Sequence, residues 1–125
     1  MEELVKEINR SLNKTLILNL ISKISMHGAE IANKLRQEYR VRIPPGTLYP
    51  ILKELELRGF IKGSWEAQPK GGQQKRYIIT PLGLKALHDV MLFLRDIVKK
   101  TSIANLHDMK DSIEKAIRNR KETSS

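Results

Sequence analysis

The stretch that decides the fold runs from Ile43 to Glu66 and reads Ile-Pro-Pro-Gly-Thr-Leu-Tyr-Pro-Ile-Leu-Lys-Glu-Leu-Glu-Leu-Arg-Gly-Phe-Ile-Lys-Gly-Ser-Trp-Glu. Pro44 and Pro45 suit the start of a helix, where a missing N–H has no partner to lose. Gly59 suits the left-handed residue that ends one. The stretch therefore predicts a short helix that passes directly into a strand, which is the order of elements in a winged helix-turn-helix.

One side of this helix is apolar at helical spacing. The helix is predicted at residues 46–58, and its apolar residues are Leu48, Ile51, Leu52 and Leu55. Thr47, Tyr49 and Lys53 fall outside this face and are predicted to be exposed. Proline costs about 3 kcal/mol in a helix interior but much less in the first turn. Pro50 therefore predicts a helix start close to Gly46 or Thr47.

A two-stranded wing is predicted to follow the helix. Residues 60–66 and 74–79 read as strands, and residues 67–73 between them hold a proline and two glycines, which favour a hairpin tip. The wing, at about residues 61–79, has a surplus of positive charge, which attracts phosphate. It carries one acid, Glu66, and the basic residues Lys62, Lys70, Lys75 and Arg76.

Three helical segments are predicted before this stretch. The first is a short amphipathic helix at residues 1–12. Its apolar residues are Leu4, Val5, Ile8 and Leu12. Two more apolar patterns, at residues 16–24 and 29–35, lie on either side of a break at His27-Gly28. The winged helix-turn-helix domain is therefore predicted at residues 13–80.

A long helix is predicted to start at Thr80 and Pro81, because threonine caps helices and proline suits the first helical position. Apolar residues then recur at the alternating spacings of a coiled-coil seam. With two neighbours they form the predicted dimer interface, Leu84, Leu87, Val90, Met91, Leu94, Ile97 and Val98. This stripe is wider than one small domain covers, so we expect a second copy to pack on it.

Residues 81–120 are predicted as a helical dimerisation region and residues 121–125 as a disordered tail. Whether residues 103–120 form a separate helix is left open. The predicted fold class is mainly α with a small two-stranded β wing.

Charge and composition narrow the class of protein. The 125 residues include 23 Lys and Arg against 14 Asp and Glu, a formal net charge of +9, which favours a polyanionic partner such as double-stranded DNA. The lack of cysteine excludes disulfides and thiolate metal sites. No apolar run approaches the roughly 18 residues of a membrane span, and the first twelve residues mix Glu, Lys and Arg, unlike a signal peptide. We expect a cytoplasmic protein with no membrane partner.

The sequence holds no arrangement typical of an enzyme. It has no Gly-rich phosphate loop, no nucleophile elbow and no Ser-His-Asp order. The three histidines, His27, His88 and His107, stand at spacings that suit no metal template. No catalytic residue, metal site or cofactor is therefore predicted.

Several motifs resemble those of the PadR family of winged-helix transcriptional repressors. The central motif is Pro45-Gly-Thr-Leu-Tyr-Pro-Ile-Leu, followed by Leu55-Glu-Leu-Arg-Gly-Phe-Ile. His27-Gly28 comes before it, and Lys75-Arg76-Tyr77 and Thr80-Pro-Leu-Gly83 come after it. The resemblance covers roughly residues 14–100.

The resemblance implies a homodimer whose long C-terminal helices cross. It also implies that the helix at residues 46–58 enters a major groove and that the wing lies on the backbone or near a minor groove. Many members of the family release DNA on binding a small aromatic or cationic effector. Here the single tryptophan, Trp65, falls in the first wing strand instead of the dimer helix, where some members place an aromatic residue. A small-molecule effector of unknown identity is therefore left open.

Residues and resemblance together predict a homodimeric, sequence-specific DNA-binding transcriptional regulator, which we expect to be a repressor. The predicted DNA contacts are Thr47, Tyr49, Lys53, Lys70, Gly71, Lys75 and Arg76. Hydroxyl and ammonium groups suit phosphates and base edges, and a glycine lets the backbone approach a phosphate. Two alternatives stay open. For Tyr49, the alternative to a DNA contact is that its ring packs on the wing and only its hydroxyl reaches solvent. For the whole protein, the alternative is a winged-helix protein–protein interaction module without sequence-specific DNA binding.

Overall fold

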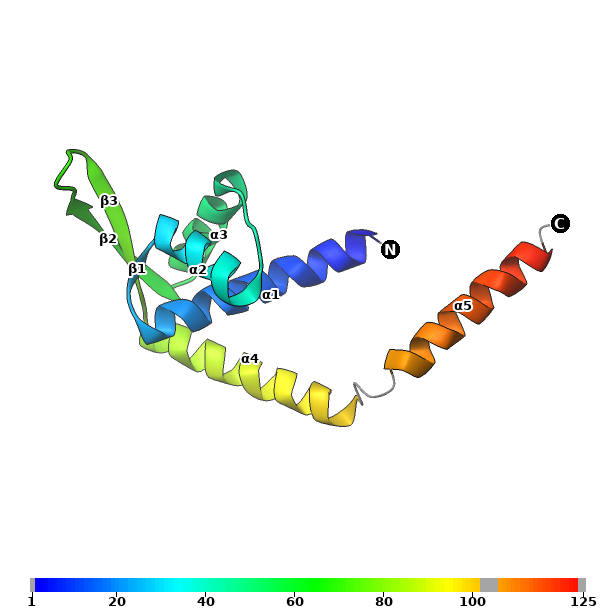
Figure 1. The fold of residues 1–125 in the computed structure, drawn as a ribbon. Coiled ribbons are helices and arrows are strands. Elements are labelled where there is room, and N and C mark those ends of the chain that lie inside the picture. Colours follow the sequence, from blue (N-terminus) through cyan, green and yellow to red (C-terminus); the bar gives the residue numbers. More distant parts are fainter. Residues whose placement is uncertain (1, 102–105, 124–125) are drawn as a thin grey trace. The chain divides into compact units, whose positions relative to one another are not determined.

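Figure 1 shows the computed structural model, which describes residues 2–101 and 106–123. Its elements are α1 (Glu2–Lys23), β1 (Met26–His27), α2 (Gly28–Tyr39), α3 (Pro45–Leu57), β2 (Ile61–Ala67), β3 (Gln73–Ile79), α4 (Pro81–Lys100) and α5 (Leu106–Thr123). The chain forms two compact units that divide within α4, the first ending at Val90 and the second beginning at Met91.

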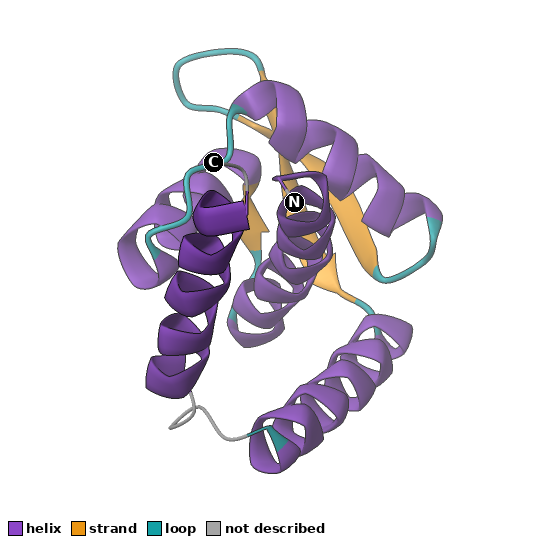
Figure 2. Cartoon of the chain, turned by 90° about the vertical axis from the view of Figure 1, so that its right-hand side faces the viewer, coloured by secondary structure: helices purple, strands orange, loops and turns teal. Residues whose placement is uncertain are grey.

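The core of the first unit lies where the C-terminal half of α1, the helices α2 and α3 and the small sheet meet. Its largest fully buried side chains are Ile17, Leu20, Ile31, Leu35, Leu48, Leu52, Leu55 and Ile61. Figure 2 shows the helices of this unit packed against the strands. The apolar face predicted for α3 is therefore the face that α3 buries, which leaves the opposite side of this helix toward solvent.

The sheet has three antiparallel strands in the order β1-β3-β2. The strands β2 and β3 are the predicted wing, with Ile61 opposite Ile79 and Trp65 opposite Lys75. The third strand is an addition to the two-stranded prediction, because β1 pairs its His27 with Arg76. A strand is recognised by alternating apolar and polar residues, and two residues are too few to show this alternation. In the sequence they were therefore visible only as a break between two helical patterns.

The separate helix predicted at residues 1–12 is wrong, because α1 is one continuous helix from Glu2 to Lys23. The chain between Leu12 and Leu16 holds neither proline nor glycine, so nothing ends the helix there. Lys14 in this linking part forms an ion pair with Glu54 of α3 at 2.8 Å. The residues Leu4, Val5, Ile8 and Leu12 on the first half of α1 are exposed.

Helix α3 begins at Pro45, slightly earlier than the predicted start at Gly46 or Thr47. Pro50 is consequently inside the helix, where it has no N–H to donate to the Gly46 carbonyl. The predicted end at Gly59 is confirmed, since Gly59 has a φ of 78°. Phe60 N–H donates to Leu55 O and Gly59 N–H to Glu56 O, both at 3.0 Å, which is a Schellman motif.

Helix α4 starts as predicted, because Thr80 Oγ1 accepts a hydrogen bond from Gly83 N–H at 3.0 Å. Leu87 of the predicted dimer seam is only 8% exposed and belongs to the core of its own unit. The spacing placed Leu87 correctly on the apolar stripe but does not show which surface covers it. The exposed members of the stripe are Leu84, Val90, Met91, Ile97 and Val98, and Leu94 is half-buried.

In the second unit, α5 is a separate helix from Leu106 to Thr123, which answers the question left open for residues 103–120. The disordered tail predicted at residues 121–125 is wrong for residues 121–123, which are helical, and residues 124–125 lie outside the described part. The apolar residues Leu106, Met109, Ile113 and Ile117 of this helix are exposed. Among the described residues, no helix has both the length and the apolar character needed to span a bilayer.

The end of α3 can be tested with Gly59→Ala. We expect the free energy of unfolding to fall by about 1–2 kcal/mol, because a side chain at this positive φ is strained. Gly46→Ala is the matched control, since an added Cβ at Gly46 meets no heavy atom within 4 Å. Urea denaturation of both variants measures the difference, and equal stability of the two would contradict the assigned cap.

Candidate nucleic-acid interface

The exposed side of α3 carries Thr47, Tyr49 and Lys53 as predicted. The ring of Tyr49 lies on Gly28 at the start of α2, where an added Cβ would stand 2.8 Å from Tyr49 Cε1. The lack of a side chain at Gly28 therefore lets the ring approach α2 closely. Tyr49 is still 51% exposed, so more than its hydroxyl reaches solvent.

A hollow of about 370 Å³ separates α3 from the wing. It is lined by Tyr49, Lys53, Glu56, Leu57, Trp65, Lys75 and Tyr77. Three of the predicted contact residues, Tyr49, Lys53 and Lys75, thus come together around one surface depression. Thr47 is exposed two residues before Tyr49 on the same helix.

The ammonium of Lys75 is engaged inside the protein. It donates to Glu56 Oε1 at 2.7 Å and lies 5.5 Å from the ring centre of Trp65 and 5.7 Å from that of Tyr77. The hydrogen bond to the Glu56 carboxylate raises the pKa of Lys75. Lys75 therefore fastens β3 to α3, and its predicted contact with DNA stays a prediction.

Glu56 receives two donors at this attachment. Its Oε2 accepts from the backbone N–H of Gly63 at 2.9 Å, so the carboxylate joins α3 to both wing strands. Partial burial raises the pKa of Glu56, but the hydrogen bonds from Lys75 and Gly63 outweigh it and leave this pKa below its usual value. The ion pair is consequently present at neutral pH.

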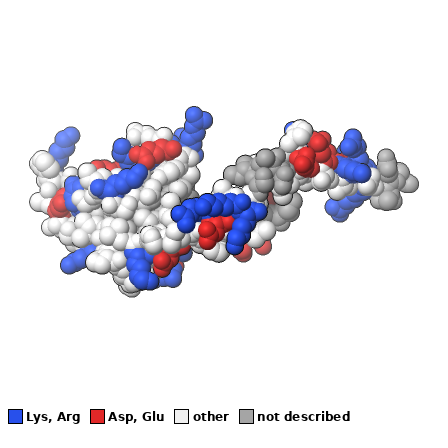
Figure 3. Space-filling view, turned by 90° about the horizontal axis from the view of Figure 1, so that it is seen from below, with Lys and Arg blue, Asp and Glu red and all other residues white. Residues whose placement is uncertain are grey.

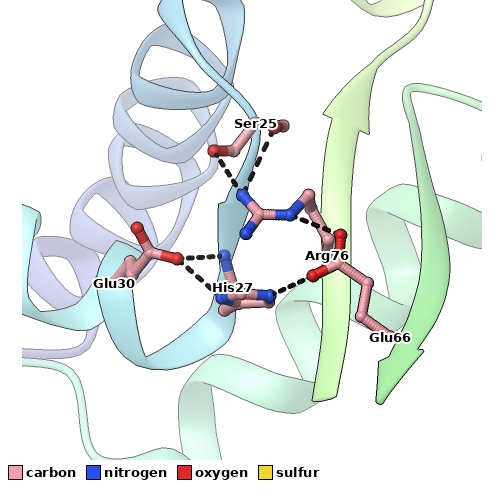
Figure 4. Close-up of polar contacts among 5 residues, drawn as sticks. All are labelled: Ser25, His27, Glu30, Glu66 and Arg76. Atoms are coloured by element: carbon pink, nitrogen blue, oxygen red, sulfur yellow. Dashed lines mark hydrogen bonds and ion pairs between the residues drawn. The ribbon is translucent and has the colours of Figure 1, made fainter. Parts of the chain in front are cut away.

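Arg76 lies on the opposite face of the wing from Lys75, because neighbouring side chains in a strand alternate between faces. Its Nε donates to Glu66 Oε1 at 2.7 Å and its Nη1 to the backbone oxygen of Ser25 at 3.2 Å. Figure 4 shows Arg76 between Ser25 and Glu66, beside His27. The structure thus separates Arg76 from the surface around Tyr49 and Lys53, and its predicted contact with DNA also stays a prediction.

Lys70 and Gly71 are exposed at the tip of the wing. The tip is closed by two backbone hydrogen bonds of 3.0 Å, from Gly71 N–H to Gln68 O and from Gln68 N–H to Gly72 O. A short closed turn holds the Lys70 ammonium at the end of the hairpin. The predicted contact of Lys70 and Gly71 with a phosphate stays a prediction.

Two basic residues beside α3 were missed in the sequence. A second hollow, of about 570 Å³, lies between α2 and the start of α3, and Arg36 and Arg42 are among its lining residues together with Tyr49. Arg36 donates to Asn33 Oδ1 at 2.9 Å. The available signal was that Arg36 falls on the polar face of α2 and that Arg42 comes just before the prolines that open α3.

The wing attachment can be tested with Glu56→Gln. We expect the free energy of unfolding at pH 7 to fall by about 1 kcal/mol, because the variant has no negative charge to pair with Lys75. Since the folded-state pKa of Glu56 is lowered, this stabilisation is present above the unfolded pKa of about 4.3 and is lost as the pH falls through the folded value. Urea denaturation at pH 7 and pH 3 should therefore show a difference that shrinks in acid. Glu38→Gln, whose partner Lys34 is 3.9 Å away on the surface, serves as control and should change little.

Comparison with known proteins gives one consistent family. The profile of the transcriptional regulator PadR-like family matches residues 17–89. The transcriptional regulator Rv3488 of Mycobacterium tuberculosis is 30% identical over 97 residues, which cover 77% of this chain and 88% of that protein.

Solved structures agree with this match. A PadR family transcription regulator from Clostridium difficile is 31% identical, with a TM-score of 0.64 over 70% of this chain and 91% of that chain. A PadR-like transcriptional regulator from Bacillus cereus, at 24% identity, shares the fold with a TM-score of 0.67 over 75% of this chain and 91% of that chain. The chain belongs to the PadR-like family of transcriptional regulators, and its winged helix is a DNA-binding fold.

Proposed function

We propose that this protein is a homodimeric repressor that binds specific DNA sequences, with α3 in a major groove and the wing on the backbone or in a minor groove. The observation that carries the proposal is the exposed side of α3, where Thr47, Tyr49 and Lys53 stand beside the basic wing in a chain of a regulator family. Hydroxyl and ammonium groups on a helix of this kind suit base edges and phosphates. Such a regulator acts where the chromosome lies, which agrees with the expected cytoplasmic location.

The described interactions divide the basic residues into two roles. Lys53 and Lys70 are exposed and are assigned to direct contact with DNA. Lys75 and Arg76 are held by carboxylates and are assigned mainly to positioning the wing. Phosphate contacts dominate affinity without reading sequence, so residues in direct contact should set its dependence on salt.

A dimer is favoured by the exposed apolar residues on α4, because a large apolar stripe facing water is unfavourable unless a partner covers it. Met91 is 48% exposed, and Ile97 and Val98 are exposed on the same helix. Figure 3 shows one face of the molecule, on which residues other than Lys, Arg, Asp and Glu cover most of the first unit. A second copy packed on the exposed apolar residues of α4 would bury them and fix the spacing of two recognition helices.

The second candidate function is a protein–protein interaction module without sequence-specific DNA binding. The same exposed apolar helices favour it, since they could pack on a different protein. This candidate function predicts that the protein does not bind, in a salt-dependent way, to DNA from the region of its own gene, whereas the first proposal predicts that it does. A small-molecule effector remains open in both cases.

Direct contact with DNA can be tested with Lys53→Ala and Lys70→Ala. Each change should weaken binding to a fragment from upstream of the encoding gene and reduce the slope of log affinity against log salt by about 0.9 for each phosphate that is no longer neutralised. Fluorescence anisotropy at several salt concentrations measures both effects. Lys85→Ala is the control, because Lys85 lies on α4 and pairs with Asp89. Unchanged slopes in both variants would argue against these contacts, and absence of any DNA binding would favour the interaction module.

The dimer can be tested with the double variant Met91→Lys and Val98→Lys. We expect monomers by light scattering and weaker binding to a two-half-site fragment, because charges would face each other in the apolar stripe. Leu87 is left unchanged, since it belongs to the core of one chain. Asp96→Lys puts a lysine at an exposed position of the same helix outside the stripe and should leave the dimer intact. A double variant that remained dimeric would refute the role of α4.

A further inference from the structure

The side chain of His27 is held between two carboxylates. Its Nδ1 lies 2.7 Å from Glu30 Oε1 and its Nε2 lies 2.9 Å from Glu66 Oε2. The ring is only 13% exposed. Figure 4 shows Glu30 and Glu66 on opposite sides of the imidazole. Both ring nitrogens are therefore within hydrogen-bond distance of an acid.

This geometry suits only one protonation state of the ring. An ionised carboxylate accepts hydrogen bonds and donates none, and a neutral imidazole has a single N–H. With neutral His27, one nitrogen lone pair would face a carboxylate oxygen. The imidazolium form, with two N–H groups, satisfies both carboxylates. Glu66 is ionised at neutral pH, because hydrogen bonds from Arg76 and then from His27 lower its pKa.

The cluster joins four parts of the winged helix. His27 lies in β1, Glu30 in the first turn of α2, Glu66 in β2 and Arg76 in β3. Glu30 Oε1 also accepts from the backbone N–H of His27 at 3.2 Å, which closes a capping box at the start of α2. Arg76 continues the chain of interactions to the backbone oxygen of Ser25.

The charged groups that face His27 can be named for each neighbouring element. They are Glu30 from α2, Glu66 from β2 and Arg76 from β3. From α3, the phenol of Tyr49 lies against the adjacent Gly28. With His27 protonated, the two acids are balanced by two cations. Loss of the proton leaves the cluster with a net negative charge.

We propose that His27 is a positioning residue whose proton holds the wing against the start of α2, so that the affinity for DNA falls as His27 loses this proton. The inference rests on the proposed DNA-binding function. When the ring becomes neutral, it can donate to only one of the two acids, so the link from Glu66 of β2 through His27 to Glu30 of α2 is broken at one side. The wing then loses one of its attachments on this face, while the bonds of Arg76 to Glu66 and Ser25 remain. The protein also carries one more negative charge, which disfavours a polyanionic partner.

The pH range for a test follows from the general chemistry of imidazole. An ordinary histidine titrates near pH 6.5, and it is the side chain whose charge changes between about pH 5 and 8. A hydrogen bond made only by the imidazolium contributes stability at the acidic end of this range, and this contribution disappears as the pH rises. Affinity for DNA should therefore be higher at pH 6 than at pH 8.

The sharpest test uses Glu66→Gln. Glu66 accepts from Arg76 with one oxygen and from His27 with the other. The side-chain oxygen of a glutamine can still accept from Arg76, and its NH₂ can donate to the nitrogen lone pair of a neutral His27. Both hydrogen bonds are therefore kept, but in the second one His27 is now the acceptor. The variant should therefore hold the wing with a neutral ring and bind DNA equally well at both pH values.

Anisotropy titrations of a fragment from upstream of the encoding gene, at pH 6.0 and 8.0 and fixed ionic strength, measure the effect. The wild type should bind about three- to tenfold more tightly at pH 6.0, which corresponds to roughly a quarter to a half of a proton taken up on binding, averaged over the two pH units. Glu66→Gln and His27→Gln should lose this dependence. His88→Gln should keep it, because His88 is an exposed residue of α4.

A second readout needs neither DNA nor a variant. NMR of the His27 ring in the wild type should show an imidazolium with two N–H groups at pH 6.0. As the pH rises and one N–H is lost, the amide signals of β2 and β3 should shift. A neutral ring at pH 6.0 would overturn the inference. Equal pH dependence of DNA binding in wild type, His27→Gln and Glu66→Gln would overturn it as well, while leaving the proposed function intact. Absence of DNA binding at every pH would overturn the proposed function and the inference with it.

Discussion

The turn at Gly59 and Phe60 holds three elements together by backbone hydrogen bonds. Phe60 N–H closes the end of α3 on Leu55 O, and Phe60 O accepts from Thr80 N–H at 3.1 Å at the end of β3. The Thr80 hydroxyl donates to Gly59 O at 2.6 Å and accepts from Gly83 N–H, which starts α4. The end of the recognition helix, the base of the wing and the start of α4 therefore share one small set of hydrogen bonds. These hydrogen bonds connect the base of the wing to the end of α3.

Above the junction, the wing is fastened on both of its faces. On one face the Lys75 ammonium and Gly63 N–H bind Glu56 of α3. On the other face Glu66 binds His27, the residue just before α2, and it also accepts from Arg76, which in turn donates to the Ser25 backbone oxygen. The alternation of side chains along a strand is what allows adjacent residues of β3 to reach different helices. Much of the positive charge of the wing is consequently used to hold the wing in place, while Lys70 at the tip remains directed to solvent.

Local signals in the sequence predicted the elements that depend on neighbouring residues. Pro44 and Gly59 flank α3, and Thr80 marks the start of α4. The family motifs led to the correct family as well. The features that were missed depend on distant residues. His27 and Glu66 are 39 positions apart and meet only through the pairing of β1 with β3, for which a two-residue strand gives no pattern. Leu87 shows the same limit, because a helical stripe reveals that a side chain is apolar and not which chain buries it.

The arrangement around Trp65 gives the molecule a built-in optical reporter. The chain contains a single tryptophan, and its indole lies on β2 with 64% of its surface exposed and the Lys75 ammonium 5.5 Å from the ring centre. Emission excited in this indole therefore comes from the wing alone, without contributions from the helices. Any event that moves the Lys75 ammonium or excludes water from the indole should change the intensity or the wavelength of that emission. Conformational changes of the wing can therefore be monitored in the unlabelled protein.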